Sequence, residues 1–390
     1  MTDLHLDMHP NLIDFGNGQP SLSLLPVDAL RTAADHCLSR GDAGLLQYGA
    51  DQGDAGFRES LAVFLTRRYA TPVSAAHLMV SAGASQALDL VCTRFTRPGD
   101  TIFVEEPTYF LALDVFRDHD LRVIGIPIDN DGICLDALHD ALSRHRPAFL
   151  YTIPSFQNPS GTTMSAARRE QLAEVSRAHD LLIVADEVYH LLDFGTPPPP
   201  PLTAYADAHG HSARVLSLGS FSKICAPGLR LGWIQGAPAL LDTLMQSGVV
   251  QSGGGLNPFV SGVMQSMLEL GLADAGLDAL RGVYAERTAV LCRALREELP
   301  VATFVEPRGG YFVWVRLPLA MSSSQLLPFA LAEGVRFHPG ARFISRDGFA
   351  HSLRLSFAHC EPAALVDGVQ RLARAVAVAV AVAADTWSEA

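Results

Sequence analysis

The chain has 390 residues, of which 48% are hydrophobic and 18% are charged, and its formal net charge is −12. This balance excludes a disordered chain, which has few apolar residues and many charges, and it disfavours a general nucleic-acid binder, which presents a basic face. The length suffices for two or three domains, or for one large α/β domain with an appendage.

Short apolar runs alternate with helical patterns over the first two thirds of the chain. The strand-like runs are Thr101–Glu105, Ala148–Ile153, Leu181–Asp186, Arg214–Leu218 and Leu231–Gln235, and the helical patterns cover Ser85–Phe95, Tyr109–Arg117 and Ser165–His179. This alternation predicts βαβ units and a mostly parallel sheet. The run LLIVAD is apolar on both faces, as a sheet covered by helices requires.

Helical patterns dominate after about Ala237. We expect a long helix over Val283–Leu299, two strands at Tyr311–Arg316 and Leu353–Phe357, and a final helix from Pro362 that continues through the alternating run Ala375–Ala384. The sequence thus predicts an α/β fold: a large domain with a mostly parallel sheet covered by helices, plus a smaller α+β domain built from both chain ends. The expected parts are residues 1–45, which pack with the small domain, 46–284 and 285–390.

The cysteines and the N-terminus bear on the compartment. The six cysteines are scattered and form no C-x-x-C pair, which is typical of buried thiols in a reducing environment. Residues 1–10 lack the basic start and apolar run of a signal peptide, and no apolar stretch approaches the ~20 residues that span a bilayer. We expect a cytoplasmic protein without a metal site and without nucleic-acid or membrane partners.

The first candidate site is Ser220-Phe221-Ser222-Lys223 with the following Gly228–Gly232, GLRLG. Lys223 lies between an apolar strand and a Gly/Pro-rich turn. A lysine that is partly desolvated near other cations loses its proton readily and can attack an aldehyde. Ser220 and Ser222 supply short donors, and Arg230 supplies a cation suited to a phosphate. A solvated loop lysine is the competing interpretation.

Asp186 stands at the carboxyl end of the strand Leu181–Asp186, where open α/β sheets bind ligands. A pyridoxal cofactor needs an acid against its ring nitrogen, and Tyr189 could bond the ring hydroxyl. A helix cap is the alternative role for Asp186. Asn158, in FQNPSG, is a second donor for the ring hydroxyl, unless the segment is an ordinary Asn-Pro turn.

Small and cationic residues supply two further anion-binding features. Ser81–Gln86, SAGASQ, opens a helix whose free N–H groups suit a phosphate, with Ser85 and Gln86 as side-chain donors; a simple N-cap competes with this interpretation. Arg354 is a cation inside the apolar run LRLSF. A buried cation needs a partner, either the carboxylate of a substrate or a structural salt bridge.

Together and in this order, these residues resemble the class I/II aminotransferases, the fold-type-I pyridoxal-phosphate enzymes, from Gly16 to about Arg371. The resemblance implies pyridoxal 5'-phosphate as cofactor and amino-group transfer between an α-amino acid and a 2-oxo acid. It assigns the Schiff base to Lys223, the pyridinium nitrogen to Asp186, the ring hydroxyl to Asn158 and Tyr189, and ring stacking to Tyr109. The implied phosphate ligands are Ala84, Ser85, Gln86, Ser220, Ser222 and Arg230. The implied substrate contacts are Arg354 with the α-carboxylate, Asn158 and Gly18.

The finer resemblance is to the kynurenine/2-aminoadipate branch, through FGNGQPSLSLLP, LLQYGADQG, YTIPSFQNPSG and SGGGLNPF. It implies that the loop Gly18–Leu22 covers the substrate. It also implies a homodimer with composite sites, in which Tyr48 reaches the neighbouring subunit's phosphate and Asn257 lies near the interface. Leu22, Tyr48, Tyr109 and Phe337 hint at tolerance for apolar or aromatic substrates. The departures at Cys225, Ala226 and Ser85-Gln86 leave the substrate side chain open.

Two other classes of function stay open from the sequence. The same cofactor and fold could serve a lyase, decarboxylase, racemase or oxidase, because fold does not fix function. A ligand-sensing module is the third hypothesis. Regulators of this family carry an N-terminal DNA-binding domain, and because the resemblance begins by Gly16, we expect no such domain here.

Overall fold

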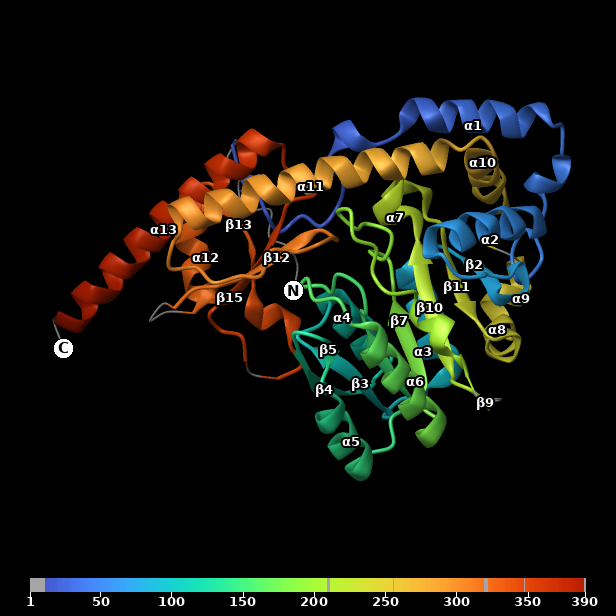
Figure 1. The fold of residues 1–390 in the computed structure, drawn as a ribbon, viewed down its shortest axis with the longest axis horizontal. Helices are drawn as coiled ribbons and strands as arrows, with labels where there is room; N and C mark the ends of the chain where they lie inside the picture. Colours follow the sequence, from blue (N-terminus) through green and yellow to red (C-terminus); the bar gives the residue numbers. More distant parts are fainter. Residues whose placement is uncertain (1–10, 209–210, 255, 319–321, 347, 389–390) are drawn as a thin grey trace.

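The computed structural model describes residues 11–208, 211–254, 256–318, 322–346 and 348–388. Figure 1 shows a larger lobe around a central sheet and a smaller lobe, with the long helix α11 (Leu272–Glu298) extending along both. The segment 1–10, on which the expectation about a signal peptide rests, lies outside the described residues. None of the described helices has the length and apolar character needed to cross a membrane.

The central sheet has eight strands among the described residues, in the order β2-β11-β10-β7-β6-β3-β4-β5. Its strands are β2 (Leu78–Ser81), β3 (Thr101–Glu106), β4 (Arg122–Asp129), β5 (Gly132–Ile133), β6 (Phe149–Thr152), β7 (Leu182–Asp186), β10 (Val215–Ser220) and β11 (Gly232–Gly236). Each neighbouring pair is parallel in the run β10, β7, β6, β3 and β4. Strand β11 is antiparallel to both β10 and β2, and β5 is antiparallel to β4. The predicted mostly parallel sheet is confirmed.

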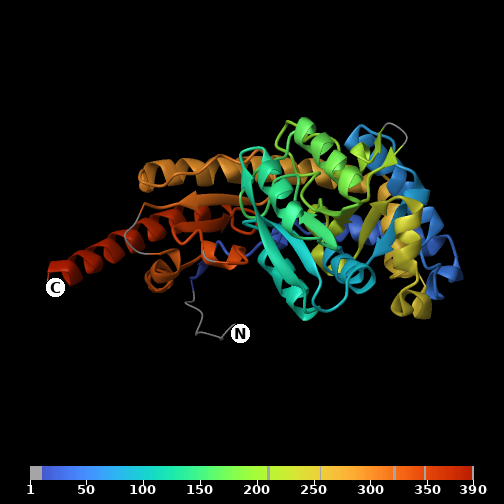
Figure 2. The same cartoon turned by 90° about the horizontal axis from the view of Figure 1, so that it is seen from below.

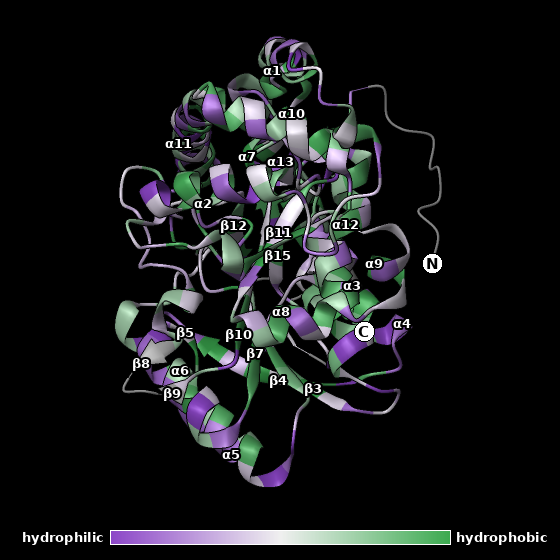
Figure 3. Cartoon of the chain, turned by 90° about the vertical axis from the view of Figure 1, so that its right-hand side faces the viewer, coloured by the Kyte–Doolittle hydropathy of each residue, from purple (hydrophilic) through white to green (hydrophobic). Residues whose placement is uncertain are grey.

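The middle strands are buried on both faces. In β7, Leu182 and Val184 belong to the main hydrophobic core, whereas Ile183 and Ala185 belong to a second core on the opposite face. Successive side chains of a strand point to opposite faces, so a strand covered on both sides needs an uninterrupted apolar run. The hydropathy colouring of Figure 3 shows this apolar character in β7 and β10.

Helices cover the sheet and border it. They are α1 (Val27–Ser39), α2 (Ala55–Tyr69), α3 (Ala84–Phe95), α4 (Phe110–Asp118), α5 (Leu135–Arg144), α6 (Ala166–His179), α7 (Phe221–Ile224), α8 (Pro238–Met245), α9 (Gly248–Gly253) and α10 (Pro258–Glu269). Residues of α2 and α3 pack in the main core, and residues of α5 and α6 pack in the second core. Two helix layers thus shield the sheet from water.

The smaller lobe contains the sheet β12-β15-β14 and the parallel pair β1–β13. Its elements are β1 (Ile13–Asp14), β12 (Phe312–Arg316), α12 (Ser323–Ala332), β13 (Val335–Arg336), β14 (His338–Pro339), β15 (Ser352–Ser356) and α13 (Pro362–Ser388). Helix α13 packs along α11, and its last turns extend away from the body of the molecule (Figure 2). The fold therefore uses both chain ends in this lobe.

The strands and helices expected before residue 240 are present, with ends shifted by one or two residues. The expected helix Val283–Leu299 is the second half of α11, and the alternating run Ala375–Ala384 is helical. The sequence analysis did not predict α1, α2, α5, β2 or β4. Strand β4 contains Pro127 and is half exposed, and α1 buries only Ala33 and Cys37, so their apolar patterns are weak.

The predicted division into three parts stays a prediction. Strand β1 pairs with β13 of the smaller lobe, in line with an N-terminal segment that packs there. Helix α1, however, packs against α10 beside the larger lobe. Helix α11 runs through the expected boundary at residue 284.

Gly219 marks a tight contact where the sheet meets the cavity described below. It lies opposite Trp233 in the β10–β11 pair, and a Cβ at this position would overlap the Trp233 indole. Gly282, on the exposed side of α11, has no atom within 4 Å of the position of a Cβ. The same substitution, glycine to alanine, can thus be compared at a closely packed position and at a solvent-exposed one.

We predict that Gly219→Ala lowers the free energy of unfolding by about 1–3 kcal/mol, the usual cost of overpacking a core. Gly282→Ala should instead raise it by about 0.5–1 kcal/mol, because alanine loses less backbone freedom in a helix. Urea unfolding followed by circular dichroism measures both changes. Equal shifts in the two variants would contradict the packing described for Gly219.

Candidate active site

The carboxyl ends of the parallel strands meet at one edge of the sheet and bring distant residues together. Strand β7 ends at Asp186, and β10 ends at Ser220, after which the short helix α7 carries Lys223. The loop after β6 contains Asn158, and the segment after β3 contains Tyr109. Ligands of open α/β sheets bind at this edge.

Most of the predicted site residues line one cavity. They are Gly18, Ala84, Ser85, Tyr109, Asn158, Asp186, Tyr189, Ser220, Ser222, Lys223, Arg230 and Arg354. The large lobe contributes all of them except Gly18, from the N-terminal segment, and Arg354, from β15. The cavity therefore lies where the two lobes meet.

Lys223 lies in this cavity with an amine that is easy to deprotonate. Its Nζ donates a hydrogen bond to the carbonyl oxygen of Gly18 at 2.6 Å. Burial, together with the nearby guanidinium groups of Arg354 and Arg230, lowers the pKa of Lys223 to about 8, although Asp186 opposes the shift. A neutral amine is a nucleophile and a base, so Lys223 is suited to both roles near physiological pH.

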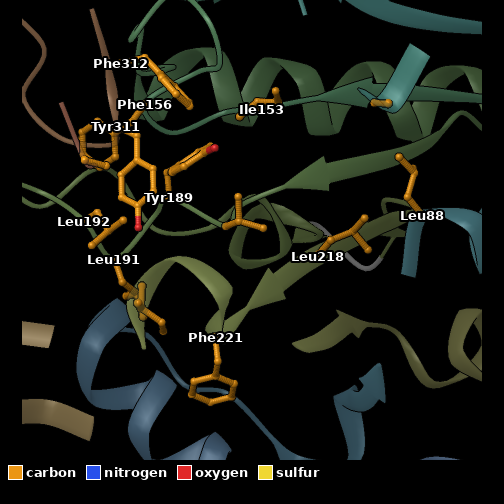
Figure 4. Packing of buried hydrophobic residues seen from close by; sticks show 14 of the residues in the cluster. Leu88, Ile153, Phe156, Tyr189, Leu191, Leu192, Leu218, Phe221, Tyr311 and Phe312 are labelled. Carbon is orange, nitrogen blue, oxygen red and sulfur yellow. The ribbon is translucent and has the colours of Figure 1, made fainter. Parts of the chain in front are cut away.

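Tyr189 and Tyr311 pack close together in the hydrophobic core (Figure 4), and Lys223 lies near both rings. Its Nζ lies 5.9 Å from the ring centre of Tyr189 and 5.4 Å from that of Tyr311. The Tyr311 hydroxyl also donates to the Lys223 backbone carbonyl at 2.7 Å. These contacts hold the lysine backbone while its amine faces the cavity.

Asp186 is buried, and one of its oxygens is unused. Its Oδ2 accepts a hydrogen bond from the Tyr151 hydroxyl at 2.7 Å, whereas Oδ1 has no hydrogen-bond partner among the described residues. Burial raises the pKa of Asp186, although the Tyr151 hydrogen bond opposes the shift. Residues 188–191 form a turn after β7, so Asp186 does not cap a helix. An unpaired buried acid oxygen calls for a ligand.

A cation and a helix start face each other across the phosphate region predicted from the sequence. Arg230 donates to Ser222 Oγ at 3.4 Å and to the carbonyl oxygens of Pro227 and Ala82, each at 3.1 Å. The N-cap residue of helix α3 is Gly83, which has no side-chain cap, whereas Gln86 Oε1 accepts the Ala82 N–H just before it. A Cβ at Gly83 would lie 3.1 Å from Arg230 Nη2. Free N–H groups beside a guanidinium suit a phosphate.

Arg354 is a buried cation without a carboxylate partner among the described residues. Its Nη1 donates to Asn158 Oδ1 at 3.0 Å and its Nη2 to the Gly16 carbonyl at 2.8 Å. No described acid lies within ion-pairing distance, and Nε has no hydrogen-bond partner. The structural salt bridge considered from the sequence is therefore absent from the described part of the chain, and the site fits an added carboxylate.

Some expected contacts differ from the structure. Gln86 does not line the cavity, because its Oε1 accepts from the Ala82 N–H at 3.2 Å. Leu22 is 81% exposed, and Phe337 is buried in the core. Neither residue lines the cavity. The loop segment that lines it is Gly16–Gln19. Tyr48 and Asn257 also lie outside its lining.

The sequence analysis missed several lining residues, including Gly16, Asn17, Phe110, Phe312 and His338. They come from loops and strands that only the tertiary fold brings together. One compositional signal was available for the central residue, since Lys223 is the only lysine in the chain. In a chain with one lysine, this signal favours a functional lysine over the competing interpretation of a solvated loop residue.

The cavity offers the groups that pyridoxal 5'-phosphate requires. Lys223 supplies an amine for its aldehyde, and the free Oδ1 of Asp186 suits a protonated ring nitrogen. Arg230, Ser222 and the start of α3 supply donors for a phosphate. The donor set thus fits the cofactor.

Known proteins share this fold and much of the sequence. Residues 10–372 match the family model for aminotransferase class I and II. The aromatic-amino-acid aminotransferase 1 of Thermococcus litoralis is 33% identical over 94% of this chain and 88% of its own. The multiple substrate aminotransferase of Thermococcus profundus superposes with a TM-score of 0.87 at 34% identity, covering 95% of this chain and 92% of that chain.

A third relative was solved with a cofactor adduct. It is LysN, the alpha-aminoadipate aminotransferase of Thermus thermophilus, complexed with N-(5'-phosphopyridoxyl)-L-leucine. It superposes with a TM-score of 0.85 at 32% identity and covers 96% of this chain and 95% of that chain. The chain therefore belongs to the class I and II aminotransferases, pyridoxal-phosphate enzymes that transfer an amino group between an amino acid and a 2-oxo acid.

Proposed function

We propose that Lys223 binds the cofactor covalently and moves a proton at the substrate Cα, and that Asp186 holds the ring nitrogen. The observation that carries this proposal is that the Lys223 amine lies in the same cavity as the buried Asp186, whose Oδ1 has no hydrogen-bond partner among the described residues. Burial lowers the pKa of this amine to about 8. When bound, pyridoxal 5'-phosphate supplies a ring that withdraws electrons from Cα. Lys223, as a positioned neutral amine, provides general-base catalysis.

The remaining residues of the cavity bind and orient the substrate and the cofactor. Arg354 holds the α-carboxylate, and Asn158 fixes the guanidinium through the 3.0 Å hydrogen bond. Arg230 and Ser222, with Ala84, Ser85 and Ser220 beside them, hold the phosphate. Tyr109 lies against the ring, and Tyr189 binds the ring hydroxyl. Gly18 covers the substrate, and at this position a Cβ would lie 3.1 Å from Phe312.

We predict that borohydride reduction of the yellow holoenzyme fixes the cofactor mass to the peptide that contains Lys223. Because Lys223 is the only lysine, the α-amino group of the N-terminus is the only other primary amine. Peptide mass spectrometry locates the label, and Lys223→Arg is the control that should remain unlabelled. A label on the N-terminus, or no label on a yellow protein, would contradict the assignment.

Asp186→Asn should keep the fold and lower kcat by on the order of 10²–10³-fold, the usual loss when one preorganised electrostatic contact is removed. The substitution is nearly isosteric, and the Tyr151 hydroxyl can still donate to the amide oxygen. Steady-state kinetics with circular dichroism measures the effect. Tyr151→Phe, which leaves the carboxylate, is the matched control and should lose less; turnover near that of the wild type in Asp186→Asn would refute the role.

We further propose a homodimer with composite sites in the cytoplasm. Tyr48 is 84% exposed, close to the exposed Leu46, and Val249 of α9 is also exposed. A Cβ at Gly254 would overlap the Gly49 carbonyl, so the Tyr48 segment lies beside the segment that precedes Asn257. Asn257 Nδ2 in turn donates to the Leu229 carbonyl at 3.2 Å, next to Arg230. An exposed apolar surface of this kind supports an interface.

The cytoplasmic assignment is supported by the cysteines. All six lie in described parts of the chain and are unpaired, as reducing compartments favour.

Complementation tests the composite site. A Lys223→Ala chain mixed with a Tyr48→Phe chain should gain activity over both parents after subunit exchange, because each heterodimer then holds one intact site. The control mixture, Lys223→Ala with Asp186→Asn, should show no gain, because both lesions belong to the same chain's part of the site. No gain in the first mixture despite proven exchange would discard the shared site.

A further inference from the structure

A second cavity lies between the two lobes, and the roles proposed above do not use it. Its volume is about 630 Å³, within the range of about 300–1,000 Å³ that is typical of sites for small organic ligands. The larger lobe lines it with residues that include Pro107, Ser160 and Thr162, and the smaller lobe lines it with residues of β12 and of the segments 303–305 and 349–352. Small-molecule sites occur preferentially at such boundaries.

The active cavity and this second cavity share one face of the sheet β12-β15-β14. Trp314 of β12 pairs with Arg354 of β15, and Arg316 pairs with Ser352. Directly paired residues of neighbouring strands point to the same face, and so do residues two apart on one strand. Arg354 lines the active cavity, whereas Trp314, Arg316 and Ser352 line the second one. The same sheet face therefore presents one arginine to each cavity.

The arginine of the second cavity, Arg316, has no acidic partner in the described parts of the chain. No ion pair joins its guanidinium to a described acid, and its hydrogen bonds with Thr303 use only backbone atoms of Arg316. Asp129 also lines the cavity, but its carboxylate lies 3.2 Å from the Arg168 guanidinium and accepts the Asp131 N–H at 2.7 Å. The positive charge of Arg316 is therefore available to an anion, and a carboxylate suits a guanidinium best.

Two aromatic rings line the same cavity as this charge. The ring centres of Trp314 and Phe349 are 6.0 Å apart, with an angle of 66° between the rings. Phe349 is 38% exposed and has a φ of 49°, a conformation that costs a bulky residue free energy and is typical of ligand-binding segments. Because Trp314 and Arg316 are two residues apart on a strand, they lie about 6–7 Å apart. This spacing suits an aromatic ring joined to a carboxylate by a short chain.

We propose that the second cavity binds an aromatic monocarboxylate, with the carboxylate on Arg316 and the aromatic ring against Trp314 and Phe349. No described residue lines both cavities, so this ligand binds apart from the Lys223 amine and is not consumed. It contacts both lobes, because the larger lobe supplies Pro107 to the same cavity.

The test uses indole-3-acetate as the probe and indole-3-ethanol as its uncharged analogue. Calorimetric titration of the wild-type holoenzyme should show tighter binding of the acid. Arg316→Gln should weaken binding of the acid about tenfold, the size of one lost charge-assisted contact. Phe349→Asn should weaken it about threefold through the lost ring contact, and the fold is kept because asparagine tolerates a positive φ. Arg293→Gln, which removes an exposed charge from α11, is the matched control and should change the affinity less than about twofold.

A second titration separates the two cavities. Enzyme loaded with N-(5'-phosphopyridoxyl)-L-alanine in place of the cofactor has its active cavity filled, and its affinity for indole-3-acetate should stay within about twofold of that of the holoenzyme. Four results would overturn the proposal: no binding of the acid by the wild type, loss of binding in the loaded enzyme, an unchanged affinity in Arg316→Gln, or equal affinities for the acid and the alcohol.

Discussion

Three charged side chains share one cavity without pairing with each other. Lys223, Arg354 and Asp186 all lie in its wall, and no ion pair joins any two of them in the described parts of the chain. Burying a charged side chain without a partner lowers the free energy of unfolding. The packing of the rest of the fold offsets this loss. The arrangement lowers the pKa of Lys223 and leaves both Asp186 Oδ1 and Arg354 Nε without partners. A ligand of complementary charge satisfies all three groups.

The central sheet holds part of this arrangement, and the loop Gly16–Gly18 contacts both this part and Arg354. Asp186 and Lys223 follow neighbouring strands, β7 and β10, so their spacing is set by the sheet. Arg354 comes from the smaller lobe. The loop Gly16–Gly18 contacts both lobes, because the Gly16 carbonyl accepts from Arg354 and the Gly18 carbonyl accepts from Lys223. The N-terminal segment thus links the lobe that carries Arg354 to the lobe that carries Lys223.

The two lobes contribute different residues to the cavity. The larger lobe provides the amine, the acid and the phosphate region, which any substrate of such an enzyme needs. The smaller lobe provides Arg354 of β15 and His338 of β14, which line the same cavity. Phe110 of the larger lobe packs against this side of the cavity, because the Arg354 guanidinium carbon lies 5.8 Å from the centre of its ring.

The sequence by itself determined the fold class and the centre of the site. Uninterrupted apolar runs such as LLIVAD predict strands buried on both faces, and a polar residue at the end of such a run, Asp186, is placed at the ligand edge by the sheet alone. Lys223, Asn158 and Arg354 were found in the same way, because each lies next to a recognisable strand. Their positions depend on local pattern, which a sequence records directly.

The tertiary structure alone decided which loops meet. Gly16, Phe110 and His338 are far apart in the chain and carry no shared pattern, yet they line one cavity. Gln86 looked like a phosphate donor but turns back to the backbone of Ala82. Strand β4 and helix α1 were missed because long-range packing stabilises them more than local periodicity does. Contacts between distant segments depend on how whole elements pack, and this information is not contained in any short stretch of sequence.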